Sequence, residues 1–148
     1  MDRKAGGPVV DNYMEASVEG IFACGNVLHV HDIVDFVTEE SEKAAVGAAK
    51  YIKNGKVQSE FVDTIPGNGV YYVVPQKIRK DNLEGKIELV MRVDDIYENT
   101  KLVLKSKGNK IGEFKKRYMM PSEMVKIQMD SQILAEENLS ELIVEIEN

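Results

Sequence analysis

The spacing of apolar residues changes once along the chain, and this change limits the folds open to it. Between residues 34 and 52, apolar and small residues recur every three or four positions, which is the spacing of one helix face. The members of this face are Val34, Val37, Ser41, Ala45, Ala48 and Ile52. From residue 70 onward, short runs alternate apolar and polar side chains, as half-buried strands do. The pattern predicts one long helix followed by a strand-rich region.

The helix is expected to run from Asp32 to Lys53. Asn54-Gly55 is a strong stop signal, because glycine readily takes the backbone conformation that ends a helix. The three glutamates at positions 39, 40 and 42 are interpreted as its solvated face.

A short apolar run precedes the helix. Ile21 to Cys24 ends at a glycine and predicts a buried strand, so the expected order is strand, tight turn, helix. That corner places free backbone N–H groups and the positive end of a helix dipole beside the end of a strand. It suits a phosphate or an electron-rich carbonyl, although any strand–helix unit has such a corner.

The residue order at this corner carries a resemblance. Residues 20–26 read Gly-Ile-Phe-Ala-Cys-Gly-Asn and follow an extended segment that contains Val10-Asp11 and Ser17. This order resembles the C-terminal FAD motif of the pyridine nucleotide-disulfide oxidoreductase family, over roughly residues 5–55. Residues 24–32 look most like the branch of FAD-dependent NAD(P) oxidoreductases. The resemblance implies a parent enzyme that binds FAD, exchanges hydride with NAD(P)H, and passes electrons to or from an organic substrate or a partner subunit.

The resemblance also implies cofactor-binding positions at Gly25, Asn26 and Val27. Asn26 stands where relatives usually have an aspartate, whose carboxylate and adjacent N–H contact the ribityl chain and pyrophosphate of FAD. An asparagine keeps an acceptor and adds a donor, so it can still bind a ribityl hydroxyl. The alternative is a plain turn asparagine.

Ile33 and Val34 match first-turn positions whose backbone N–H groups face the pyrimidine edge of the flavin in relatives. A helix N-terminus there stabilises negative charge on the reduced flavin and raises its potential. The alternative is an ordinary helix start.

His29 and His31 are the two histidines of the chain, and they are the candidate catalytic residues. One of them would lie near the isoalloxazine and act as acid or base toward the substrate. The alternative is hydrogen bonding that shapes the loop. No metal site is predicted, because further ligands are not evident nearby and Cys24 is expected to be buried as a small hydrophobe.

Two domains are expected, at residues 1–62 and 63–148, with residues 56–68 as a linker. The second would be an antiparallel, immunoglobulin-like β-sandwich, because short strands follow one another without intervening helices. The fold class is therefore α+β, a partial FAD-binding segment followed by a sandwich. The expected strands lie near residues 70–74, 87–93, 102–104, 111–119, 124–129 and 142–146.

Composition excludes several classes of protein. The 148 residues carry a net charge of −6, and neither half is basic, which argues against nucleic-acid binding. The single cysteine excludes an intramolecular disulfide and a Cys-x-x-Cys redox pair. Without a signal peptide or a long apolar run, a cytoplasmic protein without a membrane span is expected.

A Gly-x-Gly-x-x-Gly fingerprint for the pyrophosphate does not occur in the sequence. We therefore expect a C-terminal piece of a larger flavoenzyme that is inactive alone. Its partners would be the remainder of the FAD domain and, through self-association or docking, a second copy or a partner oxidoreductase subunit. The alternative is a non-catalytic interaction module built on the sandwich.

Overall fold

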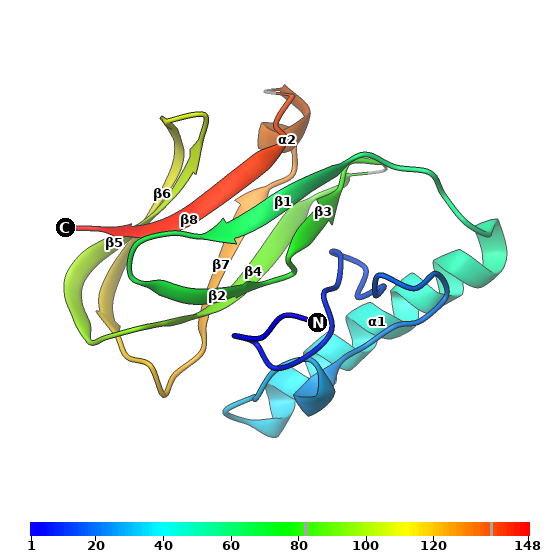
Figure 1. The fold of residues 1–148 in the computed structure, drawn as a ribbon, viewed down its shortest axis with the longest axis horizontal. Helices are drawn as coiled ribbons and strands as arrows, with labels where there is room; N and C mark the ends of the chain where they lie inside the picture. Colours follow the sequence, from blue (N-terminus) through cyan, green and yellow to red (C-terminus); the bar gives the residue numbers. More distant parts are fainter. Residues whose placement is uncertain (82, 137) are drawn as a thin grey trace.

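The computed structural model describes residues 1–81, 83–136 and 138–148. Within these ranges the chain is mixed α+β, with one long helix, one short helix and eight strands in two open sheets (Figure 1). This confirms the coarse expectation of a strand-rich α+β fold with a sandwich-like body.

The larger sheet has five strands in the order β3-β1-β8-β5-β6. Their bounds are β3 Lys77–Arg79, β1 Phe61–Pro66, β8 Glu141–Glu147, β5 Tyr97–Ser106 and β6 Asn109–Met119. The pair β1 and β8 runs parallel, with Asp63 opposite Glu141. The expectation of a purely antiparallel sandwich is therefore wrong at this pair, because β1 and β8 come from opposite ends of the strand-rich region.

The smaller sheet has three strands in the order β2-β4-β7. Their bounds are β2 Val70–Val74, β4 Lys86–Val93 and β7 Val125–Asp130. Alternate residues of β4 (Ile87, Leu89, Met91 and Val93) are buried in the core that the two sheets share. The alternation predicted from sequence thus gives the inner face of this sheet.

The long helix α1, Val34–Asn54, is confirmed, starting two residues later than expected. It ends as predicted, with Gly55 at φ 70° donating its N–H to the carbonyl of Tyr51 at 2.7 Å. Ion pairs attach it to the smaller sheet, Lys43 to Glu88 of β4 and Lys126 of β7 to Glu39, each at 2.5 Å.

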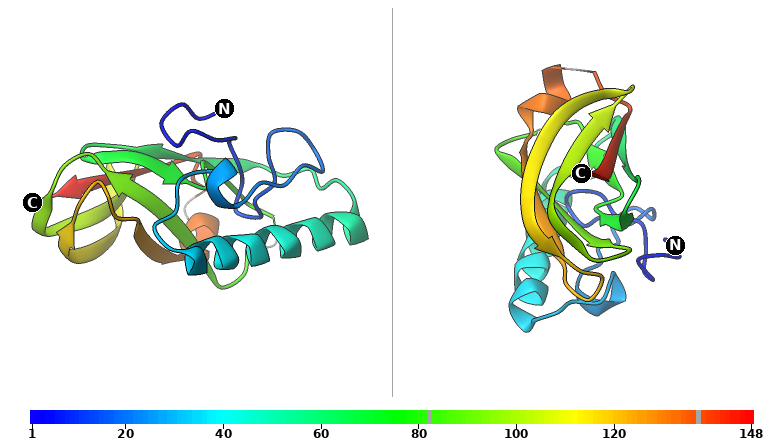
Figure 2. Two further views of the ribbon diagram at one scale, coloured as in Figure 1. Left: turned by 90° about the horizontal axis from the view of Figure 1, so that it is seen from below. Right: turned by 90° about the vertical axis from the view of Figure 1, so that its left-hand side faces the viewer.

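Residues 1–33, here called the N-terminal segment, lie between α1 and the outer face of the smaller sheet. A second cluster of buried side chains connects the N-terminal segment, α1 and the smaller sheet. Its members are Ala5, Val10, Met14, Ala23, Leu28, Ala44, Tyr72 and Val74. Figure 2 shows this segment and α1 together on one side of the curved sheets. The smaller sheet is consequently covered on both faces, which explains why Val90 of β4 is also buried.

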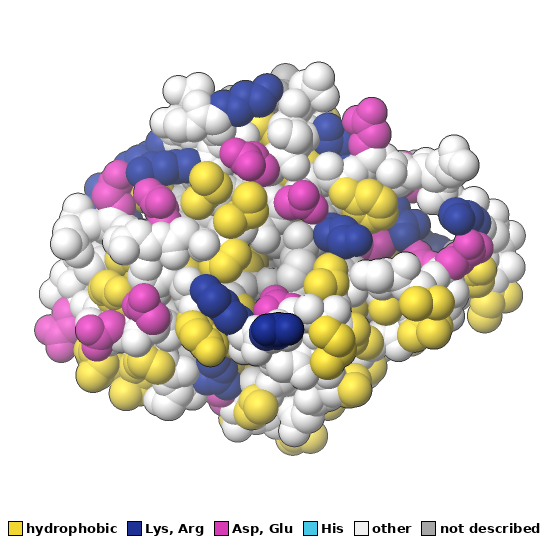
Figure 3. Space-filling view, in the orientation of Figure 1, with side chains coloured by type: hydrophobic (Ala, Val, Ile, Leu, Met, Phe, Trp, Pro, Cys, Tyr) yellow, Lys and Arg dark blue, Asp and Glu magenta, His cyan; other side chains and the backbone are white. Residues whose placement is uncertain are grey.

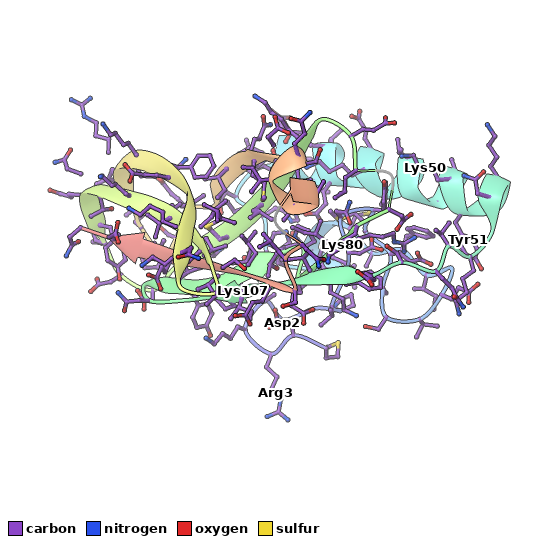
Figure 4. All side chains as sticks on the ribbon, turned by 90° about the horizontal axis from the view of Figure 1, so that it is seen from above. Asp2, Arg3, Lys50, Tyr51, Lys80 and Lys107 are labelled. Carbon is purple, nitrogen blue, oxygen red and sulfur yellow. The ribbon has the colours of Figure 1, made fainter. Side chains whose placement is uncertain are left out.

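The N-terminal segment also touches the far half of α1. The hydroxyl of Tyr51 donates to Glu19 at 2.9 Å, and the ammonium of Lys50 lies 4.6 Å from the ring centre of Tyr13. Figure 4 labels Lys50 and Tyr51 on the helix and shows Arg3 projecting away from the body of the molecule.

Some local expectations are wrong. Residues 21–24 form no strand: Phe22 makes a single bridge to Glu15, and the side chain of Ile21 is exposed. This stretch has no neighbouring strand of its own, so its backbone bonds locally instead, with Ala23 donating to the carbonyl of Met14 at 3.0 Å. Cys24 is only half buried.

The expected linker is also partly wrong, because β1 occupies residues 61–66. A five-residue helix, α2 at Gln132–Glu136, separates β7 from β8, whereas a continuous series of strands was expected. The expected domain boundary at residues 62 and 63 falls inside β1. Among the described residues, no helix is both long and apolar enough to cross a membrane.

Candidate functional site

A buried polar network lies where the N-terminal segment meets α1 and β2. The Nε2 atom of His29 lies 2.9 Å from Oε2 of Glu40, and its Nδ1 atom lies 3.1 Å from the hydroxyl of Tyr72. The side chain of His29 is fully buried. His29 comes from the loop before α1, Glu40 from α1 and Tyr72 from β2. The network therefore exists only in the folded chain.

His31 enters the same network. Its Nε2 atom lies 3.1 Å from the same oxygen of Glu40, and its ring centre is 4.5 Å from that of His29. The side chain is only 2% exposed. This separation is that of an ion pair, but the alignment is not that of a hydrogen bond. Neither ring nitrogen of His31 has a hydrogen-bond partner among the residues that the structure describes.

Glu40 is the centre of the network. Burial opposes ionisation of its carboxyl, but the hydrogen bond and charge of His29 and the backbone N–H of Gly25 together hold its pKa below the ordinary value. Gly25 donates that N–H to Oε1 at 2.7 Å. The expectation that Glu40 belongs to a solvated helix face is wrong, because the loop folds back over this face of α1.

A second, more exposed set of bonds closes the outer side of the loop. Arg92 of β4 donates to the carboxylate of Asp32 at 2.5 Å and to the carbonyl of Val30 at 3.0 Å. The other oxygen of Asp32 accepts the backbone N–H of Met124 at 2.6 Å. Asp32 therefore fastens the loop to the smaller sheet rather than capping the helix.

Tyr72 and Arg92 also interact with each other. Burial raises the pKa of the Tyr72 hydroxyl, an effect that the neighbouring Arg92 opposes. Sequence reasoning missed both residues and the role of Glu40. Tyr72 and Arg92 read as ordinary strand residues, and no local signal connects them with histidines that lie some forty to sixty positions earlier.

The predicted cofactor-binding residues lie around this network. Gly25, Asn26 and Val27 form a single 3₁₀ turn, and the side-chain oxygen of Asn26 accepts the backbone N–H of His31 at 3.2 Å. Ile33 is the residue before α1 and Val34 its first residue, and both side chains are exposed. The structure thus gathers all seven predicted site residues at one corner, with the two histidines inside and the apolar residues outside.

A cavity of ≈ 470 Å³ opens beside this corner. It lies between the N-terminal segment and the smaller sheet, and its lining includes Val30, Tyr71, Tyr72, Arg92 and Pro121. Tyr72 and Arg92 connect its wall directly to the histidines. An aromatic or apolar group would find mostly apolar surface there, with Lys4, Arg92 and Asp94 for polar contacts.

Part of the surface around the corner is apolar. Figure 3 shows hydrophobic side chains, in yellow, over the region of the N-terminal segment and α1, and no histidine is visible on that face. The exposed hydrophobic side chains at the corner include Val27, Val30, Ile33 and Val34.

Comparison with known proteins does not assign the chain to a family. No family model, curated protein or solved structure matches the chain.

Chemically, the corner combines two features. Inside, two imidazoles converge on one ionised carboxylate, an arrangement that can relay a proton or hold a cation. Outside, an apolar surface surrounds the free N–H groups at the start of α1. Because both imidazoles are buried, the inner feature favours shaping of the loop over direct contact with a substrate.

Proposed function

We propose that this chain is the C-terminal part of an FAD-dependent NAD(P) oxidoreductase. In the complete enzyme, residues 1–60 supply the flavin-ring end of the FAD site, and the two sheets form an appended, immunoglobulin-like module. The flavin accepts hydride from NAD(P)H or donates it, and exchanges electrons with an organic substrate or a partner subunit.

One observation carries this proposal: the start of α1 is both uncapped and apolar. Ile33 makes no side-chain hydrogen bond to the first turn, and Val34 is 74% exposed. A helix start that faces water usually has a serine, threonine or aspartate at the capping position. An apolar, uncapped start is instead suited to a planar ring whose electron-rich edge accepts the free N–H groups.

The surrounding surface supports the same proposal. Val27 and Val30 are 65% and 64% exposed and lie on the loop that leads into the helix. Exposed apolar side chains grouped on one loop are typical of an interface or a ligand site. The remainder of an FAD domain and the cofactor itself would cover it, and the resemblance of residues 20–26 to the FAD motif supports this assignment.

The test compares this chain with the complete protein encoded by its reading frame and any upstream extension. We expect this chain to purify without flavin, to bind FAD weakly or not at all on titration, and to show no NAD(P)H oxidation. The complete protein should carry stoichiometric flavin, measured by its visible absorbance, and oxidise NAD(P)H. Stoichiometric flavin on this chain alone would contradict its being a part of the site.

The variant Ile33→Asp makes the test sharper. In this chain a capping aspartate should raise the free energy of unfolding by about 1 kcal/mol. In the complete protein the same charge would sit at the flavin edge and should reduce flavin content and lower the flavin potential. Val46→Asp, on an exposed middle turn of α1, is the control and should leave flavin content unchanged. Equal flavin content in both variants would contradict the proposal.

The second candidate is a non-catalytic interaction module, and the same exposed apolar surface favours it. If the reading frame starts at Met1 and the purified chain self-associates through this surface without binding flavin, the module is the better description. Sedimentation measurements on wild type and on Val34→Glu would distinguish the two, since a self-association surface should be disrupted by the charge.

A further inference from the structure

We propose that His29, His31 and Glu40 form a binding site for one divalent transition-metal ion, with zinc the ion that the donor set fits best. The proposal goes beyond the flavin function and does not depend on it. Two imidazole nitrogens and one carboxylate oxygen are a common protein ligand set for zinc, with a fourth position left for water or another ligand.

The donor atoms are already close to the required separation. All three residues offer ligand atoms that lie within 4.8 Å of one another. Both Nε2 atoms lie near Oε2 of Glu40, at 2.9 Å from His29 and 3.1 Å from His31. Ligands about 2.0–2.1 Å from a tetrahedral zinc are about 3.3 Å apart, so each of these two nitrogen–oxygen separations needs to change by only a few tenths of an ångström.

His31 supplies the independent observation that a ligand is missing. The side chain of His31 is only 2% exposed, and neither of its ring nitrogens makes a hydrogen bond to a described residue. Burying such a group without a partner costs free energy, so buried polar groups are almost always satisfied. A metal ion between Nε2 and the carboxylate would provide the missing partner.

The surrounding groups hold the other two ligands as supporting residues do in metal sites. The remaining nitrogen of His29 contacts the hydroxyl of Tyr72 at 3.1 Å, and the remaining oxygen of Glu40 accepts the N–H of Gly25 at 2.7 Å. Ligating histidines nearly always use their second nitrogen in this way, which fixes the ring and its tautomer.

Space and charge also allow an ion. A small pocket of ≈ 10 Å³ adjoins His31 and Glu40, which is at the lower limit of the space that one water molecule needs. Two lysines line it, but each pairs with its own carboxylate: Lys43 with Glu88 and Lys126 with Glu39, at 2.5 Å. The added ion would join the loop at residues 29–31 to the second turn of α1.

The test uses the full chain after dialysis against a chelator. Isothermal titration with zinc should show one ion bound per chain with micromolar or tighter affinity, and zinc should raise the melting temperature. Cobalt serves as the spectroscopic probe, because a four-coordinate nitrogen–oxygen site gives visible absorption bands that zinc then removes by displacement.

Three variants identify the ligands. His31→Gln removes a group that makes no hydrogen bond, so the fold should persist while zinc affinity falls sharply and the cobalt bands disappear. Tyr72→Phe should cost about 10–100-fold in affinity, as loss of a supporting residue does. Glu42→Gln, exposed on the same helix, is the matched control and should bind zinc like the wild type.

Absence of zinc binding to a folded wild-type chain would overturn the proposal. So would equal affinity in wild type and His31→Gln, with circular dichroism showing both to be folded. Because none of these measurements involves flavin, they are decided separately from the oxidoreductase proposal.

Discussion

Asp11 is a carboxylate that the fold keeps inside at some cost. Its side chain is 4% exposed and accepts the backbone N–H groups of Tyr13 at 2.8 Å and Glu15 at 3.1 Å. Arg79 contacts its other oxygen at 2.6 Å. Burial nevertheless raises the pKa of Asp11 above 3.8, because desolvation outweighs the arginine and the hydrogen bonds.

This shift predicts a pH dependence with a definite sign. Between 3.8 and the higher folded pKa, the folded state binds more protons than the unfolded state at Asp11. The contribution of Asp11 to the free energy of unfolding therefore falls as pH rises through this window. Urea denaturation of wild type and Asp11→Asn across this range should show wild-type stability decreasing relative to the variant. A difference that is constant or grows with pH would contradict the prediction.

At the scale of elements, α1 approaches the N-terminal segment more closely than a side chain allows. A Cβ atom added at Gly47 would lie 2.2 Å from the carbonyl oxygen of Tyr13 and 3.1 Å from the ring of Phe22. The stripe of small residues that the sequence shows on this helix thus has a specific use. It lets the backbone at Tyr13 lie directly against the helix.

Gly47→Ala should therefore destabilise the protein, although alanine is the better helix former by about 1 kcal/mol. The clash with backbone is expected to lower the free energy of unfolding by about 1–3 kcal/mol. Ala45→Gly, exposed on the same helix, is the control and should cost only the helix propensity, about 1 kcal/mol. Chemical denaturation checks both variants. A Gly47→Ala protein more stable than wild type would show that the backbone at Tyr13 does not lie against this helix face.

At the scale of the whole molecule, Arg79 joins the two halves of the chain. From β3 it donates to Asp11 at 2.6 Å and to Glu15 at 2.5 Å, and its backbone N–H donates to Asn12 at 2.7 Å. Its side chain is only 13% exposed. The larger sheet therefore holds the N-terminal segment directly, in addition to the contacts through α1.

Arg79→Met should leave two largely buried carboxylates without a cation. Removing one partner of a buried ion pair costs about 3–5 kcal/mol, and we expect a loss of that order. Limited proteolysis should then cut the N-terminal segment before the sheets. Lys101→Met, whose side chain is 38% exposed and pairs with Glu113, is the control and should change stability by less than about 1 kcal/mol. Equal effects of the two variants would contradict a joining role for Arg79.

The sequence alone determined the elements whose signal is local. The helix that stops before Gly55 and the alternation in β4 both follow from residues within one turn or one strand of each other. Backbone conformation and burial of one face are short-range properties, so spacing predicts them. The strand expected at residues 21–24 is wrong because strand formation needs a partner strand that the local pattern does not specify.

Only the tertiary structure decided which residues meet. Glu40 became a buried centre, and Tyr72 and Arg92 joined the histidines, because the chain folds a loop between a helix and a sheet that are distant from it in sequence. The parallel pairing of β1 with β8 arose in the same way. Contacts between distant residues depend on how whole faces pack against each other, and that free energy is not contained in any single stretch of the sequence.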